Sequence, residues 1–225
     1  MRWAISFFFI ALLHACVVAQ KTNLDFDITA ADGAKLKATY YSPGKPGPGI
    51  LLLHQCNMDR KSWRSLAAKL VDRGIHVLTF DYRGYGETTA SGSRENIPTD
   101  IDTALATLKS KQGVDQKRLA AGGASCGVNN SVQLAKRSGE IKALLLLTGP
   151  MTKEGMAFLR TQTSLPIFAV DQAGFDSGMK ALVGNSTNPN STNVEVHKDW
   201  HGVVMFEGDP SLLDKMADWV AKVLQ

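Results

Sequence analysis

A pentapeptide with serine at its centre is the strongest chemical signal in the chain. Residues 123–127 read Gly-Ala-Ser-Cys-Gly, after a short apolar run at residues 119–121 and before a helix-like segment at residues 132–135. A strand-to-helix turn of this kind holds its serine on a strained elbow, and the glycines let neighbouring backbone approach closely. We therefore predict that Ser125 is a nucleophile and that the backbone N–H of Cys126, at the helix start, donates to an oxyanion.

A serine nucleophile needs a base that takes its proton. Downstream of Ser125 the chain contains only two histidines, His197 and His201. His201 falls in a loop between the last predicted strand and the final predicted helix, whereas His197 lies at or inside the strand end. Because catalytic groups are concentrated on loops, we predict that His201 is the base.

The base in turn needs a group that orients it, and a carboxylate in the chain order Ser, Asp, His would do so. Asp171 and Asp176 both follow the predicted strand at residues 166–170. A residue on the loop can reach back to His201, while Asp171 is held at the strand end or caps a turn. We therefore predict Asp176 as the acid, with Asp171 as the alternative.

A second oxyanion donor is predicted in the loop after the apolar strand at residues 50–53. The loop reads His54-Gln55-Cys56-Asn57, and the backbone N–H of Gln55 or Cys56 is the candidate group. His54 precedes the serine in chain order, so we expect it to pack under the elbow or to hydrogen-bond the loop.

Two other functions compete with nucleophilic catalysis. His197, Asp199 and His201 alternate along the chain, so an extended segment would present them on one face, as in a zinc-dependent hydrolase. No other ligand cluster accompanies them, and we expect neither a metal nor another cofactor. The second rival is a non-catalytic binding protein that keeps the fold.

The elements that must position these groups alternate between strand and helix. This alternation predicts an α/β fold with a mostly parallel sheet, helices on both faces, and ligands at the carboxyl ends of the strands. An N-terminal β-hairpin precedes it. The predicted strands are residues 24–29, 35–41, 50–53, 75–80, 119–122, 143–147, 166–170 and 193–196, and the main helices are residues 62–73, 99–111 and 211–224.

Taken together, the motifs resemble those of the α/β-hydrolase superfamily, and within it the dienelactone hydrolase-like group. The resemblance covers roughly residues 24–224 and rests on Leu-Leu-Leu-His at 51–54, Asp-Tyr-Arg-Gly-Tyr-Gly at 81–86, the elbow itself, and Trp-His-Gly at 200–202. It implies a serine hydrolase that cleaves an ester or related acyl bond of a small molecule through a Ser-His-Asp triad and an acyl-enzyme intermediate.

Two departures from the family pattern limit what the resemblance implies. Dienelactone hydrolases use cysteine at the elbow centre, where this chain has Ser125, so lactone specificity does not carry over. Many superfamily members have His-Gly where this chain has His54-Gln55. Only the sixteen residues 149–164 separate two strands between which relatives often insert a lid, so we expect an open site without a large lid.

Cys56 and Cys126 fall on the two loops that would build the oxyanion hole. Their Cα atoms could therefore lie within disulfide reach. We nevertheless expect them to be two small residues that pack beneath the site, with a disulfide as the alternative.

Composition and the N-terminal segment predict an exported single-domain protein. The chain has 225 residues, 44% of them hydrophobic, which suits one α/β domain at residues 20–225. Its net charge of +4 forms no basic block, so we expect no nucleic-acid partner. Arg2, an apolar stretch and then small residues predict a signal peptide at residues 1–19, and lipidation of Cys16, with membrane anchoring, is the alternative to release into the periplasm or medium.

Overall fold

A computed structural model describes residues 20–225 of the protein. The predicted signal peptide at residues 1–19 and the alternative lipidation site at Cys16 lie outside the described residues. Within the described part, no helix is long and apolar enough to cross a membrane.

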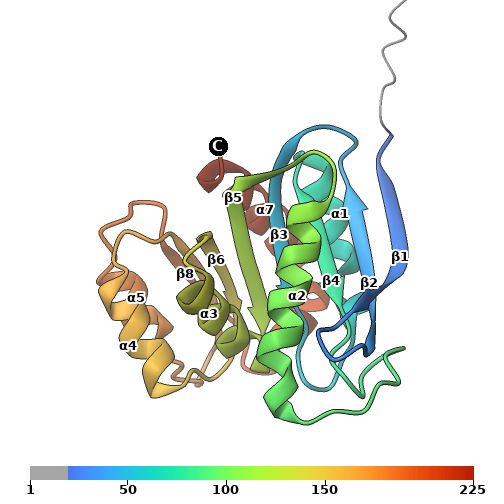
Figure 1. The fold of residues 1–225 in the computed structure, drawn as a ribbon. Helices are drawn as coiled ribbons and strands as arrows, with labels where there is room; N and C mark the ends of the chain where they lie inside the picture. The colour runs from blue at the N-terminus through green and yellow to red at the C-terminus, as the bar shows by residue number, and fades with distance from the viewer. Residues whose placement is uncertain (1–19) are drawn as a thin grey trace, which may run out of the picture.

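The centre of the molecule is an eight-stranded sheet (Figure 1) in the order β1-β2-β4-β3-β5-β6-β7-β8. The first two strands form the predicted N-terminal hairpin and pair antiparallel, as do β2 and β4, while every later pair is parallel. The carboxyl ends of the parallel strands therefore meet along one edge. The strands are β1 Thr22–Thr29, β2 Lys35–Ser42, β3 Gly47–Leu53, β4 His76–Phe80, β5 Val114–Ala124, β6 Ile141–Leu147, β7 Ile167–Gln172 and β8 Thr192–Val196.

Helices cover both faces of this sheet and bury a separate hydrophobic core on each. One core packs α1 and α7 against the sheet, and the other packs α2, α3, α4 and α5 against the opposite face (Figure 1). Burial on both faces explains why the central strands are continuous apolar runs. The helices are α1 Arg64–Asp72, α2 Ile97–Ser110, α3 Cys126–Ser138, α4 Lys153–Thr161, α5 Met179–Gly184, α6 Met205–Gly208 and α7 Ser211–Val223, with short 3-10 turns at Arg60–Trp63, Arg94–Asn96 and Gly202–Val204.

The predicted mostly parallel sheet with helices on both faces is confirmed, and the differences are local. The segment between β6 and β7 contains α4, which starts at the N-cap Thr152, whose hydroxyl accepts a hydrogen bond from Gly155 N. This one short helix packs beside α3, and no large lid is present among residues 20–225. The helix α5 is also absent from the prediction, because its six residues are too few to show a periodic pattern.

Candidate active site

Ser125 lies at the sharp turn between β5 and α3. Its backbone angles, φ 51° and ψ −118°, fall in a region that L-residues rarely adopt. Its backbone N–H donates to the carbonyl oxygens of Leu147 and Thr148, at 3.0 and 3.1 Å. Thr148 is the other non-glycine residue with a positive φ, 35°, among the described residues. Strained backbone at two adjacent strand ends is typical of a functional site, because the surrounding structure must hold it.

The two glycines of the pentapeptide allow the close backbone contacts that the turn requires. A Cβ atom at Gly123 would lie 2.0 Å from the carbonyl oxygen of Gly127. A Cβ atom at Gly127 would lie 2.3 Å from the carbonyl oxygen of Leu53, at the end of β3. Both distances are far below van der Waals contact, so a larger residue at either position would displace the turn that carries Ser125.

The structure brings His201 to Ser125. His201 Nε2 lies 2.9 Å from Ser125 Oγ, and His201 Nδ1 lies 2.6 Å from Oε1 of Gln172, the last residue of β7. The amide group of Gln172 is oriented by its other end, because Nε2 donates to the carbonyl oxygen of Lys198 at 2.9 Å. An amide oxygen can only accept, so Nδ1 of His201 carries the proton and Nε2 is free to accept from the serine hydroxyl.

The prediction that Asp176 or Asp171 contacts His201 is wrong. Asp176 is exposed, and its Oδ1 accepts from the backbone N–H of Gly178 at 3.0 Å. Asp171 is buried on the other face of β7 from Gln172, since successive strand residues point to opposite faces. Its two oxygens accept from Ser177 Oγ at 2.6 Å and Asn193 Nδ2 at 3.0 Å.

The surroundings of His201 favour its neutral form. The side chain is half-buried, and burial lowers its pKa below the ordinary value of 6.5. The ring of Phe175 packs edge-on against the imidazole, with 6.3 Å between the ring centroids. A neutral imidazole near physiological pH is the state in which His201 can take a proton.

The three backbone N–H groups predicted as oxyanion donors have no hydrogen-bond acceptor among residues 20–225. Cys126 is the first residue of α3, and no described residue accepts a hydrogen bond from its N–H. The same holds for the N–H groups of Gln55 and Cys56, in the loop after β3. The Gln55 side chain is buried, and its Oε1 accepts from the backbone N–H of Val203, two residues after His201, at 3.0 Å. Gln55 thus joins the loop after β3 to the segment that carries His201.

Cys56 and Cys126 form a disulfide, with 5.9 Å between their Cα atoms. The expectation of simple packing is therefore wrong, and the alternative drawn from the sequence, a covalent link, is present. The bond ties the loop after β3 directly to the residue that follows Ser125. It therefore fixes the two sources of the predicted oxyanion donors relative to each other.

His54 has a structural role in the same loop, as predicted. Its Nε2 accepts from the backbone N–H of Tyr82 at 3.0 Å, so the proton resides on Nδ1, which donates to the carbonyl oxygen of Gln55 at 2.8 Å. Burial lowers the pKa of His54, which keeps the ring neutral and this pair of hydrogen bonds intact.

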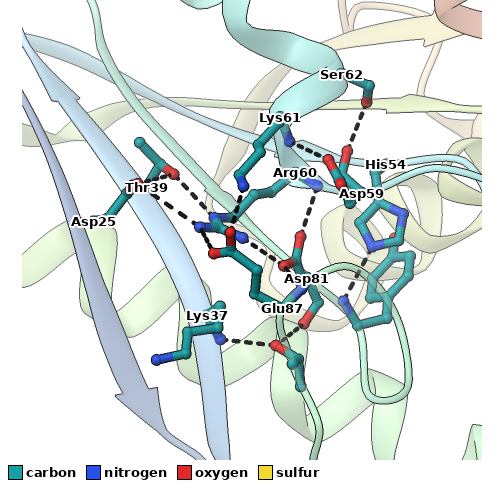
Figure 2. A network of polar contacts seen from close by, with 12 residues as sticks. Asp25, Lys37, Thr39, His54, Asp59, Arg60, Lys61, Ser62, Asp81 and Glu87 are labelled. Carbon is teal, nitrogen blue, oxygen red and sulfur yellow. Dashed lines mark hydrogen bonds and ion pairs between the residues drawn. The ribbon is translucent and has the colours of Figure 1, made fainter.

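A buried ion pair between Arg60 and Asp81 joins the segment after β3 to the segment after β4 (Figure 2). Arg60 and Asp81 are both almost fully buried, and Arg60 Nη1 lies 2.6 Å from Asp81 Oδ2. The other oxygen of Asp81 accepts from the backbone N–H of Arg60 at 2.7 Å. Arg60 also reaches Glu87 Oε2, at 2.6 Å, and Thr39 Oγ1, at 3.0 Å. This network connects the segments after β3 and β4 and gives a structural role to Asp81, the first residue of the Asp-Tyr-Arg-Gly sequence that follows β4.

The residues of the alternative metal site do not converge. The imidazole of His197 lies 3.4 Å from Asp199 Oδ2, and both side chains are exposed, whereas His201 turns toward Ser125. Among residues 20–225, no group of three or more His, Cys, Asp or Glu side chains is arranged to hold a metal ion.

Residues 48–177 match the sequence model of the alpha/beta hydrolase fold family. The chain belongs to the alpha/beta hydrolase fold family. The match includes the loop at residues 54–57 and Ser125, and it ends before His201. Membership supports a hydrolase and does not by itself identify the substrate.

The relatives that this chain resembles in sequence are matched over only part of their own length. An uncharacterized protein of Mycobacterium tuberculosis is 33% identical over 130 residues, 57% of this chain and 46% of that protein. The alpha/beta hydrolase domain-containing protein aho-3 of Caenorhabditis elegans is 30% identical over 145 residues, 64% of this chain and 42% of that protein. Human alpha/beta hydrolase domain-containing protein 17C is 30% identical over 149 residues, with shares of 64% and 42%. The matched part thus spans less than half the length of these relatives.

Solved structures share the whole fold. The esterase Pf2001 of Pyrococcus furiosus superposes with a TM-score of 0.70 and 17% identity, covering 92% of this chain and 94% of that one. A CIB-like hydrolase of Thermoplasma acidophilum gives 0.73 and 13%, covering 90% and 100%. Identities this low show the fold alone. None of these proteins singles out the dienelactone hydrolase-like group, which stays a prediction.

Gln172 is the site residue that the sequence analysis missed. It follows Asp171 directly at the end of a predicted strand, which is the position where an orienting group is sought. An amide oxygen can accept the same hydrogen bond from a histidine as a carboxylate, so Gln172 can take the place predicted for an aspartate.

Proposed function

We propose that the protein is a serine hydrolase that cleaves esters or related acyl bonds of small molecules through an acyl-enzyme intermediate. The observation that carries the proposal is the 2.9 Å contact between His201 Nε2 and Ser125 Oγ, on an elbow whose next residue begins a helix. Serine becomes a nucleophile when its hydroxyl is hydrogen-bonded to a base, and when a third group holds that base in the right orientation.

Each group has a defined task in the proposed reaction. Ser125 Oγ attacks the acyl carbon while His201 Nε2 takes its proton. The backbone N–H of Cys126, with that of Gln55 or Cys56, donates to the developing oxyanion. The tetrahedral intermediate collapses, His201 returns the proton to the leaving alcohol, and a bond remains between Ser125 Oγ and the acyl carbon. Water, deprotonated by His201, then attacks the acyl carbon, the bond to Ser125 Oγ breaks as His201 returns the proton to Oγ, and the acid is released.

The form of the site favours small or extended substrates. The short helix α4 lies beside α3, and Ser125 and His201 are both partly exposed to solvent. Among residues 20–225 no large lid covers the site, and an open site suits small substrates better than a long acyl chain that needs an enclosed apolar chamber. We therefore propose short-chain esters or thioesters as the substrate class.

Hydrolysis of p-nitrophenyl acetate, butyrate and palmitate tests this function. We expect turnover of the two short esters and little of palmitate. Ser125→Ala should lower kcat about a thousandfold or more, because the covalent route is lost. Ser110→Ala, a change at an exposed serine at the end of α2, is the matched control and should retain full activity. Absence of turnover in the wild-type protein, or an active Ser125→Ala variant, would contradict the proposal.

We also propose that the protein is exported. The support is the charged and apolar pattern of residues 1–19, together with the Cys56–Cys126 disulfide, since disulfides persist in oxidising compartments. Cell fractionation and the mass of the mature N-terminus test this. Cleavage after Ala19 indicates a released protein, a lipidated Cys16 indicates an anchored one, and an uncleaved chain in the cytoplasm would contradict export.

A further inference from the structure

The group that faces His201 Nδ1 is an amide, not an acid. We propose that Gln172 is a positioning residue that fixes the Nδ1-protonated tautomer of His201 through a neutral carbonyl group, so that the base works without a carboxylate partner. The inference rests on the proposed function, in which His201 takes the proton of Ser125, but it concerns the state of the imidazole and can be measured separately.

Gln172 is anchored at both ends of its amide. Oε1 lies 2.6 Å from His201 Nδ1, and Nε2 donates to the carbonyl oxygen of Lys198 at 2.9 Å. A flipped amide would present its oxygen to the carbonyl oxygen of Lys198, and that hydrogen bond would be lost. The backbone of the segment that carries His201 therefore selects the amide orientation, and the amide selects the histidine tautomer.

No acidic group takes over this role. Among residues 20–225, no carboxylate oxygen lies within 4.0 Å of a ring nitrogen of His201. Asp171 and Asp176 make the other hydrogen bonds described above. On the segment that carries His201, His197 pairs with Asp199, and the side chains of both, like that of Lys198, are exposed. From the remaining packed elements, His201 meets the hydroxyl of Ser125 and the uncharged ring of Phe175.

The absence of a carboxylate has a consequence for the pH dependence of the base. A carboxylate next to a histidine stabilises the imidazolium and raises the histidine pKa, whereas an amide oxygen contributes only a dipole. Burial is then the dominant influence, and it lowers the pKa of His201. On acidification, His201 should therefore stay neutral, and able to act as a base, to a lower pH than an ordinary histidine.

Nitrogen-15 NMR of the imidazole rings tests the proposal directly, with His201→Gln assigning the resonance. We expect wild-type His201 to be the Nδ1–H tautomer with a pKa below 6.5. Gln172→Met keeps the side-chain length and removes the acceptor, so it should give a mixture of tautomers. Gln172→Glu places a negative charge beside the ring and should raise the pKa of His201 by about one to three units.

The controls are Asp171→Asn and Asp176→Asn, which should leave the tautomer and the pKa of His201 unchanged. If Gln172→Met does not fold, as judged by circular dichroism, the Gln172→Glu shift and the wild-type tautomer still decide. The proposal would be overturned if the pKa of His201 in the wild-type protein were above 6.5 and either Asp176→Asn or Asp171→Asn lowered it. If the tautomer behaves as expected but Ser125 is unreactive, the positioning role stands and the proposed hydrolase function fails.

Discussion

Removal of the Cys56–Cys126 disulfide should lower the free energy of unfolding by about 4 kcal/mol. The two residues are 70 positions apart, so the bond closes a large loop in the unfolded chain. The chain-entropy relation for such a loop gives a loss of about 15 cal/mol/K, or about 4 kcal/mol at 25 °C, as an upper value. For a protein of this size the melting temperature should fall by about 8–16 °C.

Thermal unfolding followed by circular dichroism measures this effect. The oxidised protein, the same protein after dithiothreitol, and the double variant Cys56→Ala/Cys126→Ala are compared. Cys56 is exposed, so the reagent can reach the bond. Reduced protein and double variant should melt at similar temperatures, both below the oxidised protein, and dithiothreitol should not affect the variant.

Thiol titration of the unfolded samples shows whether the bond was present and then broken. Equal melting temperatures for oxidised and fully reduced protein would refute the reasoning, because the entropy of the closed loop would then contribute nothing. A melting temperature that dithiothreitol lowers equally in the double variant would show that the reagent acts elsewhere.

Three further predictions concern the turn, its support and pH. Gly127→Ala should lower the rate of ester hydrolysis by at least about tenfold and destabilise the fold by about 1–3 kcal/mol, because its Cβ would overlap the backbone at the end of β3; kinetics and urea unfolding measure both. Asp81→Ala should cost about 3–5 kcal/mol in urea unfolding because it leaves Arg60 buried and unpaired. Asp27→Ala, in an exposed ion pair, is its control and should change stability little. Neutral His54 should make its full contribution to the free energy of unfolding above pH 6.5. This contribution should fall at lower pH, because the unfolded chain takes up the proton more readily than buried His54 does. A free energy of unfolding that is flat from pH 7 to 5 in urea titrations would contradict this prediction.

The sequence predicts the fold well because its signals are local and repeated. The apolar runs that precede Ser125 and residues 54–57 are typical of strands buried on both faces, and glycine at two fixed positions marks the sharp turn around Ser125. The helix α5 was harder to predict, since its six residues give too few turns for a periodic pattern.

The site was predictable only where one residue type is required by the chemistry. Ser125 and His201 follow from chain order and loop position, and the structure places them in contact. The group beside His201 was not predictable in this way, because Asp171, Gln172 and Asp176 all follow the same strand. The alternation of side chains along β7 and the anchoring of the amide by Lys198 O decide between them, and neither is visible without coordinates.

Labelling with a fluorophosphonate, followed by mass spectrometry of the modified peptide, tests the central claim most directly, because the reagent reacts with an activated serine. Folded protein should carry one adduct, on Ser125, and His201→Ala should slow its formation by about a thousandfold or more, while heat-unfolded protein should remain unlabelled. An unmodified Ser125 in folded protein, or an adduct that forms equally fast in His201→Ala, would contradict the account of Ser125 as a nucleophile that His201 activates.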